Sequence, residues 1–235
     1  MEKTELPKFL EPEFLKRFRS YLIKYLLVFS IFWVIFLVWS PQIFPFLISP
    51  YLKLFKSNSL IFTGIEEVFL VLLKLSFYFT LMLTLPFLVI PIARFLLQHL
   101  GEGVKFFKKF SFLFILSLMI GFLVGYFLII PIFLKVLLFF GQRFEPFLKI
   151  DLFVLFLLKV LLFSVLIFQF PLALLGLIKI NLLKEEFYQR KKIYFWGFFY
   201  GLALLFSPTD FFLQILLTLT FYLFFKLSFW LAKTF

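Results

Sequence analysis

LFVLFLLKVLLFSVLIFQFPLALLGLI, residues 152–178, is an apolar stretch whose only charged side chain is Lys159. As a helix it would extend about 40 Å, which is enough to cross the ~30 Å hydrocarbon core of a bilayer. Gln169 would then lie ~26 Å from Leu152 and ~14 Å from Ile178, too deep for its short side chain to reach water. Pro171 also leaves one backbone carbonyl without its usual donor. The stretch therefore predicts a transmembrane helix with a polar group that needs a partner on another helix.

The composition of the whole chain agrees with a membrane protein. Of its 235 residues, 64% are hydrophobic and 44 are Phe, and the mean hydropathy is +1.11, whereas apolar residues make up about half of a soluble domain. The absence of Cys and the single His99 exclude a disulfide framework, a thiolate metal site and most histidine-based catalysis. We therefore expect no cofactor and no enzyme activity. The first 20 residues are polar, so we expect the first span, and not a cleavable signal peptide, to direct insertion.

Apolar runs of helical length recur along the chain between polar and Pro-rich segments. We expect an all-α, polytopic membrane protein that forms one integral membrane domain over residues 1–235. The expected spans are residues 21–39, 69–92, 110–137, 152–178, 193–206 and 211–231. The fifth reaches only ~21 Å. Ser40, Pro41, Pro45 and Pro50 are expected to end the first helix, and residues 40–68 to form an ordered cap on the membrane face.

The basic residues predict the orientation of these six spans. Of the 24 Lys and Arg, fifteen lie in residues 1–20, in the loops 93–109 and 179–192 and in the C-terminal tail, whereas four lie in the opposite loops. Basic loops stay in the cytoplasm, so both termini are expected there. The net charge of +12 is therefore a topology signal, and we expect no nucleic-acid binding.

Polar residues within the spans separate into two kinds. A lysine near a span end reaches the headgroups along its own stem, which is expected of Lys24, Lys74, Lys135, Lys159 and Lys226. Gln169 is too short for this, so its partner is either a helix of the same chain or the helix of another protein.

The glycine pairs and the acidic residues can each be interpreted as structural or as functional features. The pairs Gly121–Gly125 and Gly197–Gly201 have the spacing that lets two helix backbones approach, most commonly for packing inside the chain. Three carboxylates on the expected cytoplasmic side are Glu11, Glu13 and Glu102. They form either solvated ion pairs or an acidic site for a basic segment. Acidic residues at the outer ends of spans four and six are expected to be helix N-caps, and these are Asp151 and Asp210.

Several short patterns follow one another in a recognisable order. Glu13 to Phe18, EFLKRF, precede the first span; Pro86 and Phe95 mark the exit of the second; and GFLVGYFLIIP fills residues 121–131. Phe168-Gln169-Phe170-Pro171 lies in the fourth span, and Ser207-Pro208-Thr209-Asp210 with Gln214 opens the sixth. In this order and at these positions the patterns resemble the TatC family, the TatC component of the twin-arginine protein translocase, over nearly the whole chain. That family has six spans, both ends in the cytoplasm and short fifth and sixth helices.

The departures from the family pattern identify the chain as similar to a divergent member. The acidic residue of span four is Gln169 here, which keeps a hydrogen-bonding role and removes a titratable one. Glu102 falls two places before the position where the family has its loop glutamate. In span six the family's Pro and Glu are Thr220 and Lys226, so the charge at the second position is reversed.

The resemblance implies a receptor and scaffold that binds twin-arginine signal peptides at its cytoplasmic face and assembles with single-span TatA- or TatB-like partners to export folded proteins. It also implies the bacterial cytoplasmic (inner) membrane, a periplasmic position for the cap, a homo-oligomer in the receptor complex and no nucleotide. The implied signal-peptide residues are Glu13, Arg17, Phe95 and Glu102. The implied partner-helix contacts are Gln169, Pro171, Gly197, Gly201, Pro208, Asp210 and Gln214.

Two other classes of function compete with this one. A small-solute permease with a midplane site at Gln169 would need several converging polar residues and an internal repeat, and the sequence has one deep polar residue and no clear repeat. An intramembrane serine protease would need a His within a span, whereas His99 lies in an expected loop.

Overall fold

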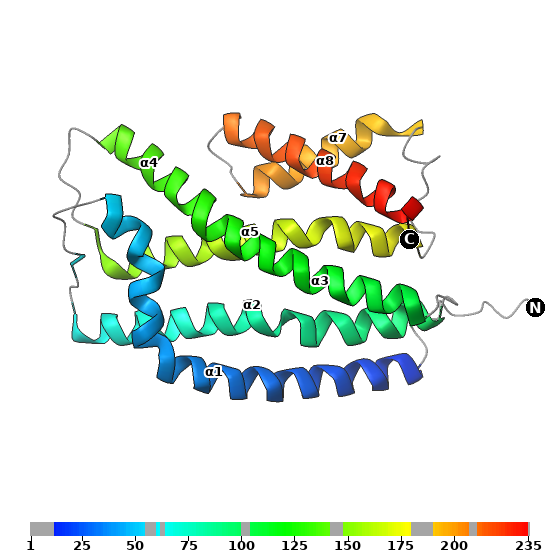
Figure 1. Ribbon diagram of the computed structural model, residues 1–235, viewed down its shortest axis with the longest axis horizontal. Helices are drawn as coiled ribbons and strands as arrows, with labels where there is room; N and C mark the ends of the chain where they lie inside the picture. The colour runs from blue at the N-terminus through cyan, green and yellow to red at the C-terminus, as the bar shows by residue number, and fades with distance from the viewer. Residues whose placement is uncertain are drawn as a thin grey trace, which may run out of the picture. The chain divides into compact units, whose positions relative to one another are not determined.

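The regular structure of the described residues is helical apart from one isolated β-bridge between Ile61 and Lys149. The computed structural model describes residues 12–54, 60–61, 64–99, 104–141, 148–179, 190–206 and 211–234. The helices in Figure 1 are α1 (Pro12–Leu54), α2 (Ile65–His99), α3 (Val104–Val124), the π-helical turn η2 (Gly125–Ile129), α4 (Ile130–Gly141), α5 (Ile150–Lys179), α7 (Lys192–Phe206) and α8 (Phe211–Thr234). The predicted all-α class is confirmed.

The chain separates into two compact units. The first unit comprises Met1–Phe95 and Phe122–Val165, and the second comprises Leu96–Gly121 and Leu166–Phe235. The helix α3 and the helix α5 each contribute to both units.

Within the part of the chain that the structure describes, four helical segments are long and apolar enough to cross a membrane, namely Phe18–Leu54, Glu66–Arg94, Phe106–Lys135 and Ile150–Ile178. The helix α7 has 15 residues and extends ~22 Å, as expected for the fifth span. The expectation of a short sixth helix is wrong, because α8 has 24 residues and extends ~36 Å. A membrane protein of several apolar helices is therefore established, whereas the count of six spans stays a prediction.

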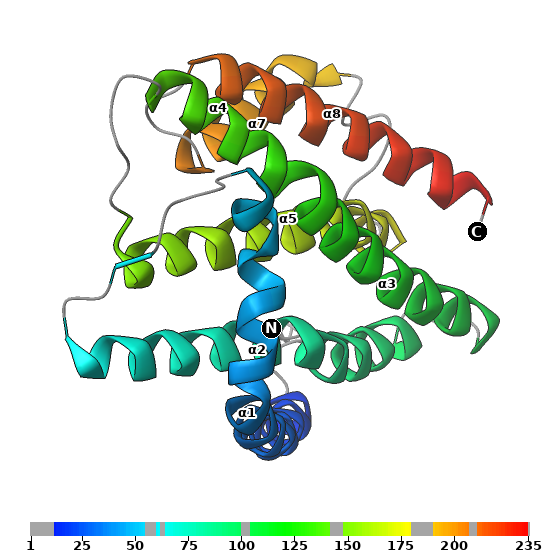
Figure 2. The ribbon, with the colours of Figure 1, turned by 60° about the vertical axis from the view of Figure 1, so that its left-hand side comes forward.

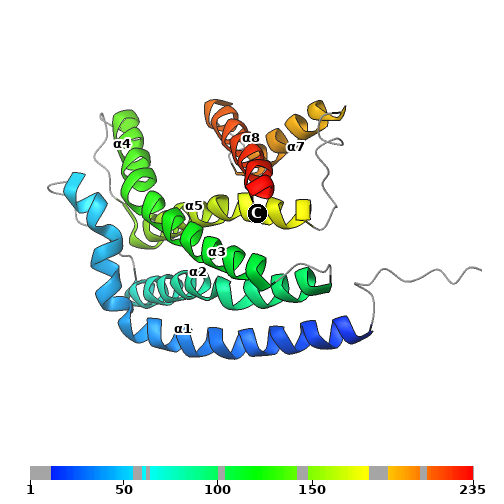
Figure 3. The same ribbon diagram turned by 45° about the vertical axis from the view of Figure 1, so that its right-hand side comes forward.

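The prediction that prolines end the first helix is wrong. The helix α1 continues to Leu54 with three prolines inside it. Proline lacks an N–H, so the carbonyl four residues earlier loses its helical donor. The Ser40 hydroxyl donates to Leu37 O at 2.7 Å, which is the carbonyl that Pro41 leaves free. The helix therefore bends without ending, and Figure 3 shows its axis turning sharply.

A second freed carbonyl is satisfied from another helix of the first unit. Pro50 leaves the carbonyl of Phe46 without a helical donor, and the Tyr126 hydroxyl donates to it. The Tyr126 ring stacks on the Phe46 ring with centroids 4.3 Å apart and planes at 11°. The Ser49 and Tyr126 hydroxyls are 2.9 Å apart. The residues expected to form an ordered cap on the membrane face are thus helical as far as Leu54.

The first part of α1 packs along α2 through aromatic rings and hydroxyl groups. The rings of Phe29 and Phe77 meet edge to face with centroids 5.5 Å apart. The indole nitrogen of Trp33 donates to Ser76 Oγ at 3.2 Å, so a polar side chain inside the apolar α2 has a partner. In Figures 1 and 3 the two helices run side by side.

The turn η2 lies against α5 within the first unit. A Cβ added at Gly125 would lie 2.8 Å from Ser164 Cβ and 3.1 Å from Leu161 Cδ1, which is closer than side chains normally approach. Gly125 therefore lets the backbone of η2 come close to α5. The predicted internal packing role is confirmed for Gly125.

The core of the second unit is aromatic. The helices α7 and α8 form a pair (Figure 2). The Phe170 ring lies on Phe199 of α7 and Phe221 of α8, at centroid distances of 6.0 Å and 5.1 Å. The buried residues of this cluster come from α5, α7 and α8, and they are Leu174, Phe199, Phe221 and Phe225.

Candidate functional site

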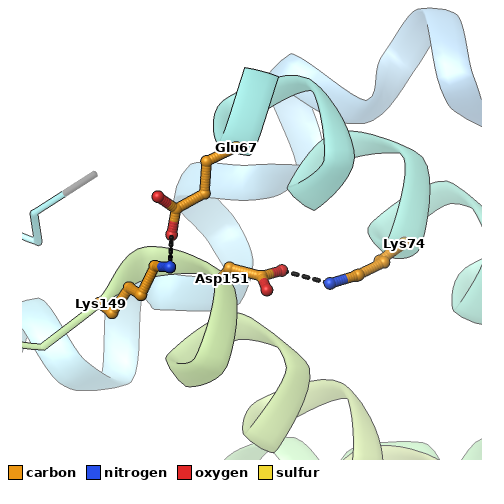
Figure 4. A network of polar contacts seen from close by, with 4 residues as sticks. All are labelled: Glu67, Lys74, Lys149 and Asp151. Atoms are coloured by element: carbon orange, nitrogen blue, oxygen red, sulfur yellow. Dashed lines mark hydrogen bonds and ion pairs between the residues drawn. The ribbon is translucent and has the colours of Figure 1, made fainter. Parts of the chain in front are cut away.

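Two ion pairs join the starts of α2 and α5 in the first unit. Figure 4 shows Lys74 paired with Asp151 and Glu67 paired with Lys149. Glu67 and Lys74 are two turns apart on one face of α2, and Asp151 lies in the first turn of α5. The Lys149 Nζ to Glu67 Oε1 distance is 3.7 Å, and the Glu67 side chain is only 8% exposed. Opposite charges therefore face each other across these two helix starts.

Backbone hydrogen bonds join Ile61 to the start of α5, next to these ion pairs. Ile61 N donates to Leu148 O at 3.1 Å, and Ile150 N donates to Ile61 O at 3.0 Å. The second bond satisfies one of the donors that the start of α5 leaves free. Ile61 thus bonds to the backbone on both sides of Lys149.

The sequence predicted different roles for two residues of these ion pairs, Lys74 and Asp151. Lys74 was expected to extend to the headgroups, and its ammonium pairs with Asp151 instead. Asp151 was expected to be an N-cap, and it lies inside the first turn of α5, where a negative charge is favourable near the helix start. A spacing of 77 residues between the partners gives no local signal for the pair.

We expect Asp151→Ala to lower the free energy of unfolding by about 1 to 2 kcal/mol, because Lys74 then keeps a charge without its partner. The effect is smaller than for a fully buried pair, since the two side chains are 35% and 23% exposed. Thermal unfolding in detergent measures it. Lys159→Ala is the control, because Lys159 is exposed, and it should change little. Equal midpoints for the Asp151 and Lys159 variants would contradict a stabilising pair.

Gln169 has a partner inside the second unit. Ser117 Oγ donates to Gln169 Oε1 at 3.0 Å, and Gln169 Nε2 donates to Phe114 O at 3.4 Å. Both partners lie in α3. Of the two alternatives that the sequence left open, the structure thus shows the one inside the chain. A primary amide has two donor and two acceptor positions, so these bonds leave one N–H and one lone pair. Contact of Gln169 with another protein stays a prediction.

We expect Gln169→Leu to lower the free energy of unfolding by ~0.6 to 2 kcal/mol, the range for hydrogen bonds between membrane helices. Ser117→Ala removes the hydroxyl partner of the same bond. Thermal unfolding of both single variants and the double variant gives their coupling. Because both changes remove one interaction, the double variant should lose less than the sum of the two single losses. Strictly additive losses would contradict the bond.

Of the residues predicted to contact a partner helix, some are buried and others face open space. Pro171 is buried and α5 continues through it. Gln214 is 5% exposed, and its Oε1 accepts a hydrogen bond from the Tyr200 hydroxyl at 3.1 Å. A Cβ added at Gly197 or Gly201 would meet nothing within 4 Å. The two glycines therefore face open space, and Gln214 joins α8 to α7.

The other predicted site residues lie outside what the structure describes. Glu13 and Arg17 are in the helix α1 and Phe95 is in α2, but their side chains are not among those described. Glu102, Pro208 and Asp210 lie outside the described residues altogether. Their roles stay predictions.

Lys226 takes part in a cluster that the sequence did not predict. Its Nζ lies over the Tyr222 ring, 5.0 Å from the centroid. The Tyr222 ring stacks on Trp196 of α7 with centroids 4.4 Å apart and planes at 25°. Helical side chains lean toward the helix N-terminus, so the ammonium is directed one turn back from Lys226 and away from the end of α8. The i, i+4 spacing of Tyr222 and Lys226 was the available signal.

Comparisons with known proteins agree over almost the whole chain. The family model described as Sec-independent protein translocase protein (TatC) matches residues 13–219. The Sec-independent protein translocase protein TatC of Aquifex aeolicus (strain VF5) is 27% identical over 229 residues, which are 94% of this chain and 93% of that protein. A crystal structure of the twin-arginine translocase receptor TatC has a TM-score of 0.78 at 25% identity and covers 94% of this chain and 98% of that chain. A second, in DDM, has a TM-score of 0.80 at 25% identity, covering 93% and 98%.

Proposed function

Since this chain belongs to the TatC family of Sec-independent protein translocase proteins, we propose that it is the receptor and scaffold subunit of a twin-arginine translocase. The observation that carries the proposal is the agreement of its fold, over almost its full length, with structures described as twin-arginine translocase receptors. It is a component of a translocase and a membrane protein of several apolar helices. We expect it to bind and position proteins without catalysing a reaction.

The proposed membrane is the bacterial inner membrane, with both termini in the cytoplasm and the segment 40–68 toward the periplasm. The charge asymmetry of the loops supports this orientation. Arg190, Lys191 and Lys192 are exposed at the start of α7, where the orientation requires a cytoplasmic surface. The ion pairs of Glu67 and Asp151 then lie toward the periplasmic side.

The proposed ligand at the cytoplasmic face is a twin-arginine signal peptide. Glu13 and Glu102 would each bind one guanidinium, because a planar guanidinium and a carboxylate form two parallel hydrogen bonds. Arg17 and Phe95 are proposed to lie beside them. The peptide enters from the side on which folded cargo is made.

The proposed partners are single-span proteins of the TatA or TatB type. The open face of α7 at Gly197 and Gly201 supports docking there, because a helix backbone can approach a glycine closely. The spare hydrogen-bonding positions of Gln169 would face such a helix, and Pro171, Pro208, Asp210 and Gln214 are the further proposed contacts. Several copies of the chain would assemble in the receptor complex.

Peptide binding tests the proposed function directly. The purified chain in liposomes should retain a fluorescent twin-arginine peptide at least about tenfold more tightly than the same peptide with two lysines. The reason is that Lys keeps the charge but loses the planar, bidentate geometry. Fluorescence anisotropy measures both affinities. Equal affinities would remove the support for a twin-arginine receptor.

The permease alternative is not favoured by the contacts of Gln169. A midplane solute site needs several convergent polar groups. Among the described residues, the recorded polar contacts of Gln169 are Ser117 and the Phe114 carbonyl, and both belong to helix packing.

A further inference from the structure

Lys226 is a cation directed toward the middle of a long apolar helix. It lies ~12 Å before the end of α8. Its side chain is exposed, and its ammonium rests over Tyr222, the residue one turn further from that end. A lysine that extended to the headgroups would be directed the other way. The structure thus places a positive charge on the outer surface of α8 at a level where the chain around it is apolar.

The second unit provides no carboxylate for this charge among its described residues. Its ranges 96–99, 104–121, 166–179, 190–206 and 211–234 contain neither Asp nor Glu. Among the described residues, Lys226 contacts the face of Tyr222, and the Tyr222 ring stacks on Trp196. A ring face compensates an ammonium only in part, whereas a carboxylate at the same place compensates it fully.

At the level of Lys226, α7 and α8 expose backbone and apolar side chains. Trp196 and Tyr222 stack across the α7–α8 pair, so they mark one level on both helices. Gly197 follows Trp196 directly, and a Cβ there would meet nothing within 4 Å. Leu223 and Leu227, on either side of Lys226, are 63% and 41% exposed. The level therefore combines an open backbone, exposed apolar side chains and a single positive charge.

We propose that this surface binds a transmembrane helix of a partner protein that carries an Asp or Glu at the level of Lys226. The proposal rests on the proposed function, because it specifies a partner of the same receptor. With α8 as the proposed sixth span, lipid phosphates would lie in the headgroup layer beyond its end, opposite to the direction of the ammonium. The charge complementarity therefore favours a carboxylate within the apolar layer over a lipid phosphate. A partner with Lys or Arg at this level would be repelled.

Site-specific photocrosslinking in native membranes tests the proposal. The full-length protein carries a benzophenone amino acid at position 223 or at position 227, and the crosslinked peptides are sequenced by mass spectrometry. The expected adduct is a single-span protein with Asp or Glu within one helical turn of the crosslinked residue. Lys226→Gln should lower its yield about tenfold, whereas Lys226→Arg keeps the charge and most of the yield. Lys159→Gln, an exposed lysine of α5, should leave the yield unchanged.

A charge exchange completes the test. Lys226→Glu should abolish the adduct, and replacement of the partner's acidic residue by Lys should restore it. Four results would each overturn the proposal: adducts only with lipid, adducts with a helix that has no acidic residue nearby, no adduct at all, or a yield that Lys226→Gln does not change. Retention of the twin-arginine peptide is measured on the same membranes. If the peptide is retained while any of these results is found, this inference fails and the proposed function stands.

Discussion

The double substitution Glu13→Ala and Glu102→Ala is expected to abolish crosslinking of a twin-arginine peptide to this chain. Each carboxylate is proposed to hold one guanidinium, and hydrogen bonds to charged groups contribute about 1.5 to 3 kcal/mol each. Loss of both sites therefore predicts a fall in affinity of about 100-fold or more. A peptide with a photoreactive group next to its arginines measures the effect as crosslinking yield, and anisotropy in liposomes gives the affinity.

The matched control for this prediction is Glu66→Ala. Glu66 is an exposed acidic residue in the first turn of α2, which the proposed orientation places on the periplasmic side. The control removes one negative charge without touching the cytoplasmic face, so the yield should not change. The single variants should each lose part of the yield. Unchanged crosslinking in the double variant would show that the peptide is bound by other residues.

The limits of α5 and α7 could be predicted from hydropathy alone. The expected fourth span at residues 152–178 differs by at most two residues at either end from α5 at Ile150–Lys179. The expected fifth span at residues 193–206 differs by one residue from α7. Hydropathy succeeds here because a helix in a bilayer satisfies its own backbone hydrogen-bonding groups. The ends of an apolar run therefore indicate the ends of the helix.

The continuation of α1 could not be predicted, because it depends on partners that are distant in the chain. Three prolines predicted an end near residue 40. The carbonyl that Pro50 leaves free is satisfied by the hydroxyl of Tyr126, 80 residues beyond Phe46. Helix propensity and proline rules describe only neighbouring residues. The Tyr126 hydroxyl that satisfies this carbonyl belongs to the π-helical turn η2, which the sequence did not predict either.

For the polar residues, depth in the membrane predicts that a partner is needed, but only the packed structure shows which residue the partner is. The depth of Gln169 predicted correctly that its amide needs a partner, and only the structure identified Ser117. The positions of Lys74 and Lys226 near span ends predicted the same behaviour for both. The structure pairs one with Asp151 and places the other over Tyr222. A long flexible side chain has several possible partners, so its choice depends on packing.

The second large effect is expected at Gly125. In Gly125→Ala the new methyl would lie 2.8 Å from Ser164 Cβ, so η2 and α5 must move apart. Such overpacking costs about 1 to 3 kcal/mol, and Gly125→Leu should cost more. The midpoint of thermal unfolding in detergent should fall accordingly. Ser164→Gly removes the colliding Cβ, so Gly125→Ala should cost less in the Ser164→Gly background than in the parent protein.

Gly176→Ala separates close packing from helix propensity. Gly176 also lies within a long helix, α5, but a Cβ there would meet nothing within 4 Å. Because Ala is a better helix former than Gly by up to about 1 kcal/mol, this variant should be as stable as the parent protein or slightly more so. The same chemical change should therefore have opposite signs at positions 125 and 176. Stabilisation at both positions would mean that η2 moves away from α5 at little cost in free energy. Destabilisation at Gly125 that Ser164→Gly relieves would show that the close approach of the η2 and α5 backbones stabilises the first unit.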